Sequence, residues 1–355
     1  MVESAVVVGA GLIGTSIALA LGRHGVDVAL SDRDPAALRL ACDLGAGRAL
    51  PEAPAAPADV AVIAVPPSVV PAALYDAQDR GLAHVYTDVA SVKTSVITWA
   101  EALGCDLASY VPGHPMGGRE KQGPGAARAD LFLGRSWALC PTAKTDPTAV
   151  ETVTRLAELC GADPLLVDEA AHDRAVALVS HAPHAVSAAV AARLLDGDAT
   201  ALALAGQGVR DMTRIAGGDP DLWVEILGHN AGPVAAVLER VAADLSAAAA
   251  ALRSASPGGV GDLLERGRAG HARIPGKHGA HRTPDYAVLS VVIPDEPGAL
   301  GRLFAAAAEA GVNVEDVRID HSPGLPLGVA QLSVVPAAQE RLARALTESG
   351  WSVHT

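Results

Sequence analysis

His114 and Ser91 are the residues of this chain whose types and settings could carry proton-transfer chemistry. His114 stands in the segment 111–120, VPGHPMGGRE, where glycine and proline indicate a turn-rich loop rather than a packed core. The ordinary pKa of histidine lets it accept or release a proton near neutral pH. Ser91 could hydrogen-bond His114 from the segment 87–93, TDVASVK. We therefore expect a general base at His114, with Ser91 orienting and polarising the reacting group.

A glycine-rich turn, GAGLIG at 9–14, follows the first predicted strand and opens a helix. Its glycines allow a tight turn, a close approach of the backbone to a pyrophosphate and close packing of helix on strand, and the helix N-terminus offers amide donors to phosphates. Asp32 follows Gly14 by 18 residues, where a carboxylate can accept hydrogen bonds from a ribose 2′-hydroxyl and repel the 2′-phosphate of NADP. NAD is therefore the expected cofactor, although the neighbouring Arg33 would favour NADP. The residues expected at the cofactor are Gly9, Gly11, Leu12, Ile13, Gly14, Asp32, Arg33, Val65 and Pro66.

The dinucleotide turn decides between two chemistries for the Ser91–His114 pair. Serine and histidine cooperate in acyl transfer, but the sequence has no nucleophile elbow. Both residues follow predicted strands, so they should lie at the carboxyl edge of the sheet beside the nicotinamide. Hydride transfer is the preferred interpretation.

The elements that must position these residues fall into three folded regions. Residues 1–168 alternate short apolar runs with helical-period segments, which predicts an α/β Rossmann-type, doubly wound domain with a parallel sheet. The predicted strands are 5–8, 26–31, 60–65, 84–88, 109–111, 136–140 and 165–167. Residues 169–253 are rich in Ala, Leu and Val at helical spacing and predict an all-α domain for substrate binding and dimerisation.

A linker and a small third domain are expected in the C-terminal part. Residues 254–284 are rich in Gly, Pro, Arg and His, which indicates a linker or exposed loop. Residues 285–355 predict a βαββαβ order. Its strands are expected at 286–293, 312–319, 327–335 and 351–354, and its helices at 299–310 and 337–349.

Composition excludes several classes of function. A formal net charge of −13 disfavours nucleic acid and anionic membranes, because such partners require clustered Lys and Arg. The four cysteines show no metal-ligand spacing and no paired pattern, so we expect reduced thiols in the cytoplasm and no metal site. The first apolar run is interrupted by glycines and has no basic residues before it, which fits neither a signal peptide nor a transmembrane span.

Taken together, the motifs resemble those of the prephenate and arogenate dehydrogenase family of tyrosine biosynthesis. The motifs that carry the resemblance are GAGLIG at 9–14, DVASVK at 88–93, GHPMGG at 113–118, EKQG at 120–123, SHAPH at 180–184 and DMTRIA at 211–216, with Trp223 nine residues after Arg214. The resemblance implies an NAD-dependent oxidative decarboxylation of prephenate to 4-hydroxyphenylpyruvate, with His114 as base. The planar guanidinium of Arg214 suits a substrate carboxylate, and Ser180 and His184, four residues apart on one expected helix face, could reach the pyruvyl end.

The C-terminal region resembles an ACT domain, an amino-acid-sensing module. Tyrosine is the candidate effector, and the expected ligand residues are Asp295, Gly298, Leu300 and Asn313. The helical domain is expected to pair two chains into a homodimer, because alanine-rich surfaces permit close helix approach.

Three alternatives stay open at this stage. The substrate could be arogenate, or the 4-amino-4-deoxyprephenate of secondary metabolism, because fold and cofactor do not separate these substrates from prephenate. His184 favours a keto or carboxylate side chain over an additional ammonium group. A non-enzymatic NAD-binding amino-acid sensor is the third reading.

Overall fold

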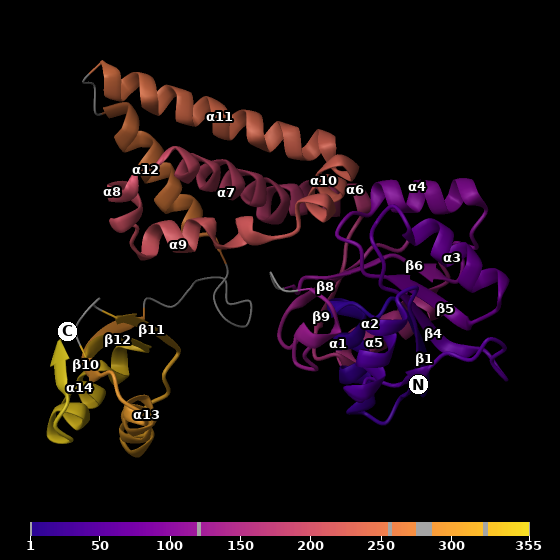
Figure 1. The fold of residues 1–355 in the computed structure, drawn as a ribbon, viewed down its shortest axis with the longest axis horizontal. Helices are drawn as coiled ribbons and strands as arrows, with labels where there is room; N and C mark the ends of the chain where they lie inside the picture. The colour runs from indigo at the N-terminus through magenta and orange to yellow at the C-terminus, as the bar shows by residue number, and fades with distance from the viewer. Residues whose placement is uncertain (1, 119–121, 255–257, 275–285, 322–325, 355) are drawn as a thin grey trace. The chain divides into compact units, whose positions relative to one another are not determined.

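The chain folds into two compact units, Met1–Ala247 and Ala248–Thr355. The computed structural model describes residues 2–118, 122–254, 258–274, 286–321 and 326–354 (Figure 1). Glu120, which belongs to one of the family motifs, lies outside the described residues.

A six-stranded parallel sheet forms the centre of the first unit, with strand order β3-β2-β1-β4-β5-β6. Its strands are β1 (Ser4–Val8), β2 (Asp27–Ser31), β3 (Arg48–Ala49), β4 (Ala58–Ile63), β5 (Ala83–Asp88) and β6 (Tyr110–Val111). The strand order reverses between β1 and β4, and ligands of doubly wound sheets bind at the carboxyl side of such a switch point. The predicted parallel sheet is confirmed for β1, β2, β4, β5 and β6, whereas β3 was not predicted.

Helices cover both faces of this sheet (Figure 1). They are α1 (Leu12–Gly22), α2 (Pro35–Asp43), α3 (Val70–Asp79), α4 (Thr94–Leu103) and α5 (Pro147–Leu159). Side chains of α1, α2 and α5 share one apolar cluster with alternate strand residues such as Val7 and Val62, whereas α3 and α4 share a second with Val6 and Ile63. Because neighbouring strand residues point to opposite faces, one run of apolar residues serves both clusters.

The last predicted strands form a separate sheet, which corrects the expectation of a single parallel one. β7 (Gly113–Pro115) pairs antiparallel with β8 (Ser136–Leu139), and β8 pairs parallel with β9 (Asp163–Leu166). An apolar run predicts a strand but does not identify its partner. The chain leaves the main sheet after β6 at Pro112, whose carbonyl accepts a hydrogen bond from the Cys140 amide.

The helical part of the first unit begins after β9, as the sequence predicts. Its α-helices are α6 (Glu169–Val176), α7 (Ala182–Arg193), α8 (Ala199–Ala203), α9 (Gln207–Thr213), α10 (Pro220–His229) and α11 (Ala231–Arg253), and the last of these continues into the second unit. Shorter helical turns are the π turn η2 (Ala177–His181) and the 3₁₀ turns η3 (Leu194–Asp196) and η4 (Arg214–Gly217). Its buried apolar core is small and consists of Ala177, Ala182, Val234 and Val237.

The continuous helical stretch Glu169–Asp196 is long and apolar enough to cross a membrane by length and composition. This is weak evidence for a span, because core helices of soluble proteins pass the same test. The stretch carries His172 and Asp173, which are buried and hydrogen-bonded within the first unit. These contacts favour a helix of the protein core.

The second unit contains a four-stranded antiparallel sheet with the order β11-β12-β10-β13. Its elements are β10 (Ala287–Pro294), α13 (Ala299–Glu309), β11 (Asp316–His321), β12 (Leu327–Val334), the 3₁₀ turn η6 (Pro336–Ala338), α14 (Gln339–Glu348) and β13 (Ser352–His354). Leu303 of α13 and Leu342 and Leu346 of α14 pack in one cluster with the buried strand residues. The predicted βαββαβ order is confirmed.

A helix lies within the segment for which the sequence predicts a linker. This helix, α12, spans Gly258–His271. Glycine and arginine obscured its pattern, yet Leu263 and Leu264 are strong helix formers and an i,i+3 ion pair joins Glu265 to Arg268. The interpretation of 258–271 as a loop was therefore wrong.

Candidate active site

The glycine turn between β1 and α1 can be built only from glycine at two of its positions. Gly9 has φ +106°, and a Cβ there would lie 2.2 Å from the carbonyl oxygen of Ala64. A Cβ on Gly14 would lie 2.0 Å from the carbonyl oxygen of Gly9. Around Gly11 a Cβ would meet nothing within 4 Å, so the backbone is open there. This combination of two closed positions and one open one fits a pyrophosphate lying against the turn.

Asp32 closes the other side of the turn. Its Oδ2 accepts a hydrogen bond of 2.6 Å from the Ala10 amide, and its Oδ1 accepts one of 2.7 Å from the Asp34 amide. The carboxylate is therefore fixed at the end of β2 beside the turn, where the sequence predicts a ribose partner. Arg33 is exposed.

The remaining predicted cofactor residues flank this turn. Leu12 and Ile13 are half-buried in the first turn of α1, and Val65 is half-buried just after β4. Pro66 is exposed and begins the approach to α3. The turn, Asp32 and the residues after β4 thus stand together at the strand-order switch point.

A buried ion pair between Lys93 and Asp88 connects β5 to β7. The Nζ of Lys93 donates to Oδ1 of Asp88 and, over 2.6 Å, to the carbonyl oxygen of Gly113. Tyr110 donates its hydroxyl to Oδ2 of Asp88, and burial together with the Asp88 charge raises the pKa of Tyr110. A Cβ on Gly113 would lie 2.7 Å from the carbonyl oxygen of Asp88. These contacts fix the strand that carries His114.

His114 lies in β7 and is buried, with 9% of its surface exposed. The expectation of an irregular, open loop at this residue was wrong, because Gly113–Pro115 pairs with β8. Burial first, and then the neighbouring His172, lower the pKa of His114 well below its ordinary 6.5. The imidazole is therefore neutral at neutral pH and can accept a proton.

Two residues of α6, which the sequence analysis did not assign, complete the surroundings of His114. Its Nδ1 lies 2.9 Å from Nε2 of His172, and Nδ1 of His172 lies 2.9 Å from Oδ1 of Asp173. Asp173 also accepts hydrogen bonds from the amides of Lys93 and Thr94. Burial would raise the pKa of Asp173, but these hydrogen bonds outweigh it and lower the value to about 2.

Ser91 is half-buried just before Lys93. The hydrogen bond expected between Ser91 and His114 is not formed among the described residues; the partner of His114 there is His172, at Nδ1. The only signal for His172 and Asp173 in the sequence is their adjacency at the start of the helical part. A role for Ser91 toward a substrate remains a prediction.

The residues expected at the far end of the substrate lie on three elements. His184 of α7 stacks on Trp223 of α10 with ring centroids 3.5 Å apart and an interplanar angle of 13°. Burial lowers the pKa of His184, so its ring is neutral. Ser180 belongs to the π turn η2, and the α-helical spacing on which a shared face with His184 was predicted does not apply across this turn.

His181, beside Ser180, is fully buried and packs edge-on against Trp223. Its Nδ1 lies 3.0 Å from the Nδ2 of Asn230, which also donates to the carbonyl oxygen of Asp173. Burial lowers the pKa of His181 to about 4. His181 therefore serves as a neutral structural histidine, and it is not one of the predicted site residues.

Arg214 opens η4 and is exposed. It lines a largely apolar cavity of about 450 Å³ together with residues of α7, α9 and α11. His114 and Ser91 are not among the described residues that line this cavity. The structure thus places Arg214 and the His114 group in the same unit without joining them in one described pocket.

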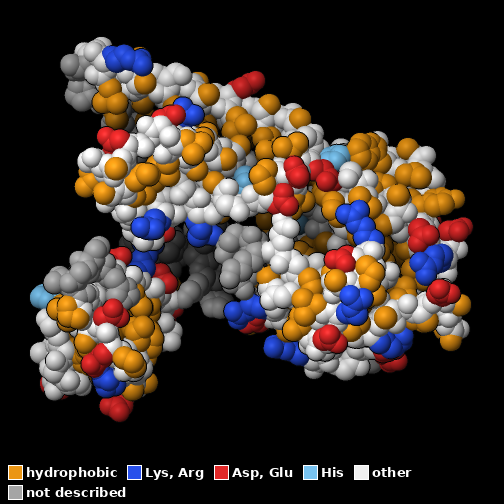
Figure 2. Space-filling view, in the orientation of Figure 1, with side chains coloured by type: hydrophobic (Ala, Val, Ile, Leu, Met, Phe, Trp, Pro, Cys, Tyr) orange, Lys and Arg blue, Asp and Glu red, His pale blue; other side chains and the backbone are white. Residues whose placement is uncertain are grey.

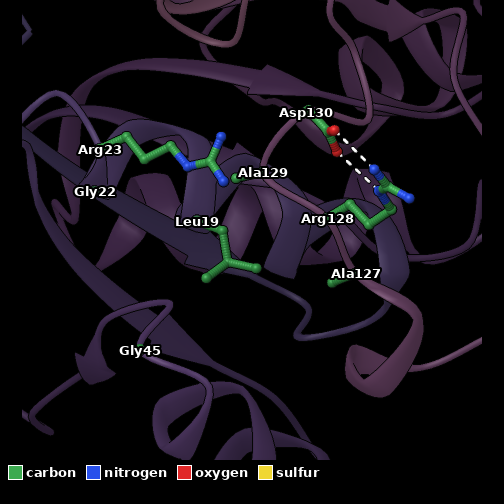
Figure 3. A pocket seen from close by; sticks show the side chains of 8 residues that line it. All are labelled: Leu19, Gly22, Arg23, Gly45, Ala127, Arg128, Ala129 and Asp130. Carbon is green, nitrogen blue, oxygen red and sulfur yellow. Dashed lines mark hydrogen bonds and ion pairs between the residues drawn. The ribbon is translucent and has the colours of Figure 1, made fainter. Parts of the chain in front are cut away.

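A second cavity in the first unit, of about 530 Å³, lies beside the C-terminal end of α1 (Figure 3). Arg128 makes two hydrogen bonds of 2.8 Å to the carboxylate of Asp130 on its rim, and Arg23 extends from the opposite side (Figure 3). The glycine turn precedes the other end of α1. This cavity is therefore not the cofactor site.

A third cavity, of about 390 Å³, lies in the second unit. Of the residues predicted to hold an effector, Asn313 lines it, together with Phe304 and Val317. Asp295, Gly298 and Leu300 are not among its described lining residues. Gly298 has φ +86° and caps α13, which explains a glycine there without a ligand.

The fold and site define an NAD-dependent dehydrogenase: a doubly wound sheet has a dinucleotide turn after β1, and a buried neutral histidine lies in β7. Residues 17–166 match the family profile "Prephenate dehydrogenase, nucleotide-binding domain", and residues 168–264 match "Prephenate dehydrogenase, dimerization domain". The chain belongs to the prephenate dehydrogenase family.

Known relatives agree with this assignment. The chain is 41% identical to "Probable prephenate dehydrogenase NovF" of Streptomyces niveus over 363 residues, which cover 99% of this chain and 100% of that protein. The prephenate dehydrogenase structure from A. aeolicus, in complex with hydroxyphenyl propionate and NAD+, has a TM-score of 0.67 and 27% identity, covering 76% of this chain and 98% of that one. Synechocystis arogenate dehydrogenase gives a TM-score of 0.63 at 27% identity, with the same coverage.

Proposed function

We propose that the chain converts prephenate to 4-hydroxyphenylpyruvate with NAD, in tyrosine biosynthesis. The observation that carries the proposal is His114, a buried neutral imidazole with one ring nitrogen held by His172. Its other nitrogen, Nε2, has no hydrogen-bond partner among the described residues and is available to a substrate hydroxyl. The family assignment supports the same reaction.

The residues divide the reaction as follows. His114 takes the proton of the ring hydroxyl at C4, Ser91 orients that hydroxyl, and Arg214 pairs with a substrate carboxylate. When bound, NAD accepts the hydride from C4. The ring carboxylate leaves as carbon dioxide, its bonding electrons complete the aromatic ring, and the phenolate oxygen recovers the proton from His114. The sum is prephenate and NAD giving 4-hydroxyphenylpyruvate, carbon dioxide and NADH, with His114 returned to its basic form.

Arogenate and 4-amino-4-deoxyprephenate are the rival substrates. The neutral ring of His184 neither repels an ammonium group nor pairs with a carboxylate by charge, so the structure removes the electrostatic argument for prephenate drawn from this residue. The experiment that decides is a comparison of kcat/KM for the three substrates with NAD and with NADP. We expect prephenate with NAD to exceed every other combination by at least about tenfold. Higher efficiency with either rival, or with NADP, would contradict the proposal, and the absence of turnover would favour an NAD-binding sensor.

We further propose that the helical part pairs two chains. The matched dimerization domain and the exposed apolar side chains of this part support pairing, and hydrophobic side chains are spread over it in Figure 2. Examples are Leu178, Val179, Leu195, Leu204 and Val224, which are 58% to 88% exposed. Soluble monomers rarely leave so much apolar surface in water. Sedimentation should show a dimer; a monomer at working concentrations would contradict this.

The second unit, in this proposal, is an ACT-like regulatory domain that binds tyrosine. Its support is the βαββαβ order, the antiparallel sheet order and the cavity beside Asn313. NovF shares this unit, since its match covers 99% of the chain.

A cytoplasmic location accords with the reduced state of the four cysteines, none of which forms a disulfide.

A further inference from the structure

The donor and the acceptor of each hydrogen bond around His114 can be assigned, starting from Asp173. Asp173 has a pKa lowered to about 2, so its carboxylate only accepts hydrogen bonds. The His172 nitrogen facing it, Nδ1 at 2.9 Å, must therefore carry a hydrogen. An imidazole with a single N–H that donates from Nδ1 to Asp173 presents the lone pair of its Nε2 toward His114, and this is the form of His172 on which the inference is built.

The same assignment of donor and acceptor extends to His114. His114 faces the lone pair of His172 with Nδ1 at 2.9 Å, so this nitrogen must be the donor. The lone pair of neutral His114 then lies on Nε2. The opposite tautomer would place two lone pairs against each other, unless His172 also reversed and turned its own lone pair on the Asp173 carboxylate.

We propose that His172 and Asp173 are positioning residues that hold His114 in the Nδ1–H tautomer and so make Nε2 the nitrogen that accepts the substrate proton. This inference rests on the proposed function and deepens it, because it names the residues that prepare the base. Neither residue needs to touch the substrate. Asp173 itself accepts hydrogen bonds from the Lys93 and Thr94 amides. The segment that carries Ser91 therefore also holds the first residue of the Asp173–His172–His114 series of hydrogen bonds.

The charges around His114 allow it to accept a proton. The titratable and charged groups that act on it are His172, Lys93, His181 and Asp173. The charge of Lys93 is paired with Asp88, and His181 is neutral because burial lowers its pKa to about 4. The carboxylate of Asp173 remains as the group that stabilises a protonated His114, through His172. A similar carboxylate–histidine arrangement fixes the tautomer of the base in serine proteases.

Two substitutions of His172 separate positioning from mere packing. Gln can present its amide oxygen where His172 presents Nε2, whereas Leu fills the space without an acceptor. We expect H172L to lower kcat about 10²-fold and H172Q less than about tenfold, with the Kd for NAD unchanged in both. Equal losses in H172L and H172Q would overturn the proposal. H84L, which removes an exposed histidine of β5, is the control and should retain full activity.

The tautomer can be measured without substrate. In enzyme labelled with ¹⁵N-histidine, NMR distinguishes a protonated ring nitrogen from an unprotonated one, and H114Q identifies the His114 signals. We expect a protonated Nδ1 and an unprotonated Nε2 in the wild type, and a loss of this single pattern in H172L. A protonated Nε2 in the wild type above pH 7 would overturn the proposal. Because this measurement uses the free enzyme, failure to turn over prephenate would count against the proposed function alone.

Discussion

At the residue scale, the burial of the proposed base, His114, should decide the pH dependence of the reaction. Burial and the neighbouring His172 lower its pKa well below 6.5, so the base form is already present at neutral pH. Activity should be lost only as pH falls through this lowered pKa. We therefore expect kcat/KM for prephenate to be constant above pH 6.5 and to fall on the acid side of that value.

The test is the pH profile of the wild type beside that of H114A. The variant should lose about 10²–10⁴-fold in kcat and retain its affinity for NAD. An acid limb centred above pH 6.5, or near-normal turnover by H114A, would show that another group is the base.

The sequence predicts His114 as the base but does not predict its neighbours. His114 could be recognised because it stands in a motif with unusual glycine and proline content. His172 and Asp173 follow His114 by more than 50 residues and are brought to it by α6, so no local pattern connects them. Contacts between distant elements depend on how those elements pack, and a single sequence does not encode that packing in any local spacing.

At the element scale, the buried ion pair of Lys93 and Asp88 determines how firmly β7 is held to β5. Both side chains are fully buried, and removal of one partner leaves an uncompensated charge. We expect K93M to lower the free energy of unfolding of the first unit by about 3–5 kcal/mol.

The matched control is K144M, which removes the exposed ion pair of Lys144 with Glu101. Exposed pairs contribute about 0–1 kcal/mol, so this variant should unfold close to the wild type. Urea unfolding followed by the fluorescence of Trp99, Trp137 and Trp223, in a W351F background, reports on the first unit. Equal stability of K93M and K144M would contradict the role given to the buried pair.

Elements were predicted well where apolar periodicity was strong and poorly where glycine or a change of partner intervened. The main sheet and the βαββαβ order follow from regular apolar runs. Helix α12 was missed because its glycines dilute the pattern, and the two-residue strand β3 is too short to show one. The π turn η2 was missed because its sequence, ALVSH, does not differ in pattern from the α-helices on either side.

At the scale of the whole molecule, the chain joins two compact units, Met1–Ala247 and Ala248–Thr355. The A. aeolicus and Synechocystis structures match 76% of this chain and 98% of their own. NovF matches 99% of it. We propose the second unit as the site of regulation, and its cavity beside Asn313 is where an effector would bind.

The regulatory role can be tested by a single side chain. Of the four residues predicted to bind the effector, Asn313 is the one among the described lining residues of the cavity in the second unit. If tyrosine binds there, N313A should weaken inhibition by up to about tenfold, because one hydrogen bond contributes about 0.5–1.5 kcal/mol. The measurement is the tyrosine concentration that halves the rate, in full-length enzyme, with T347A on α14 as the control. Asn313 also donates a hydrogen bond to Glu315, so the deletion of residues 285–355 is measured beside N313A. An unchanged inhibition constant in N313A, together with inhibition that survives this deletion, would place any tyrosine site in the catalytic unit instead.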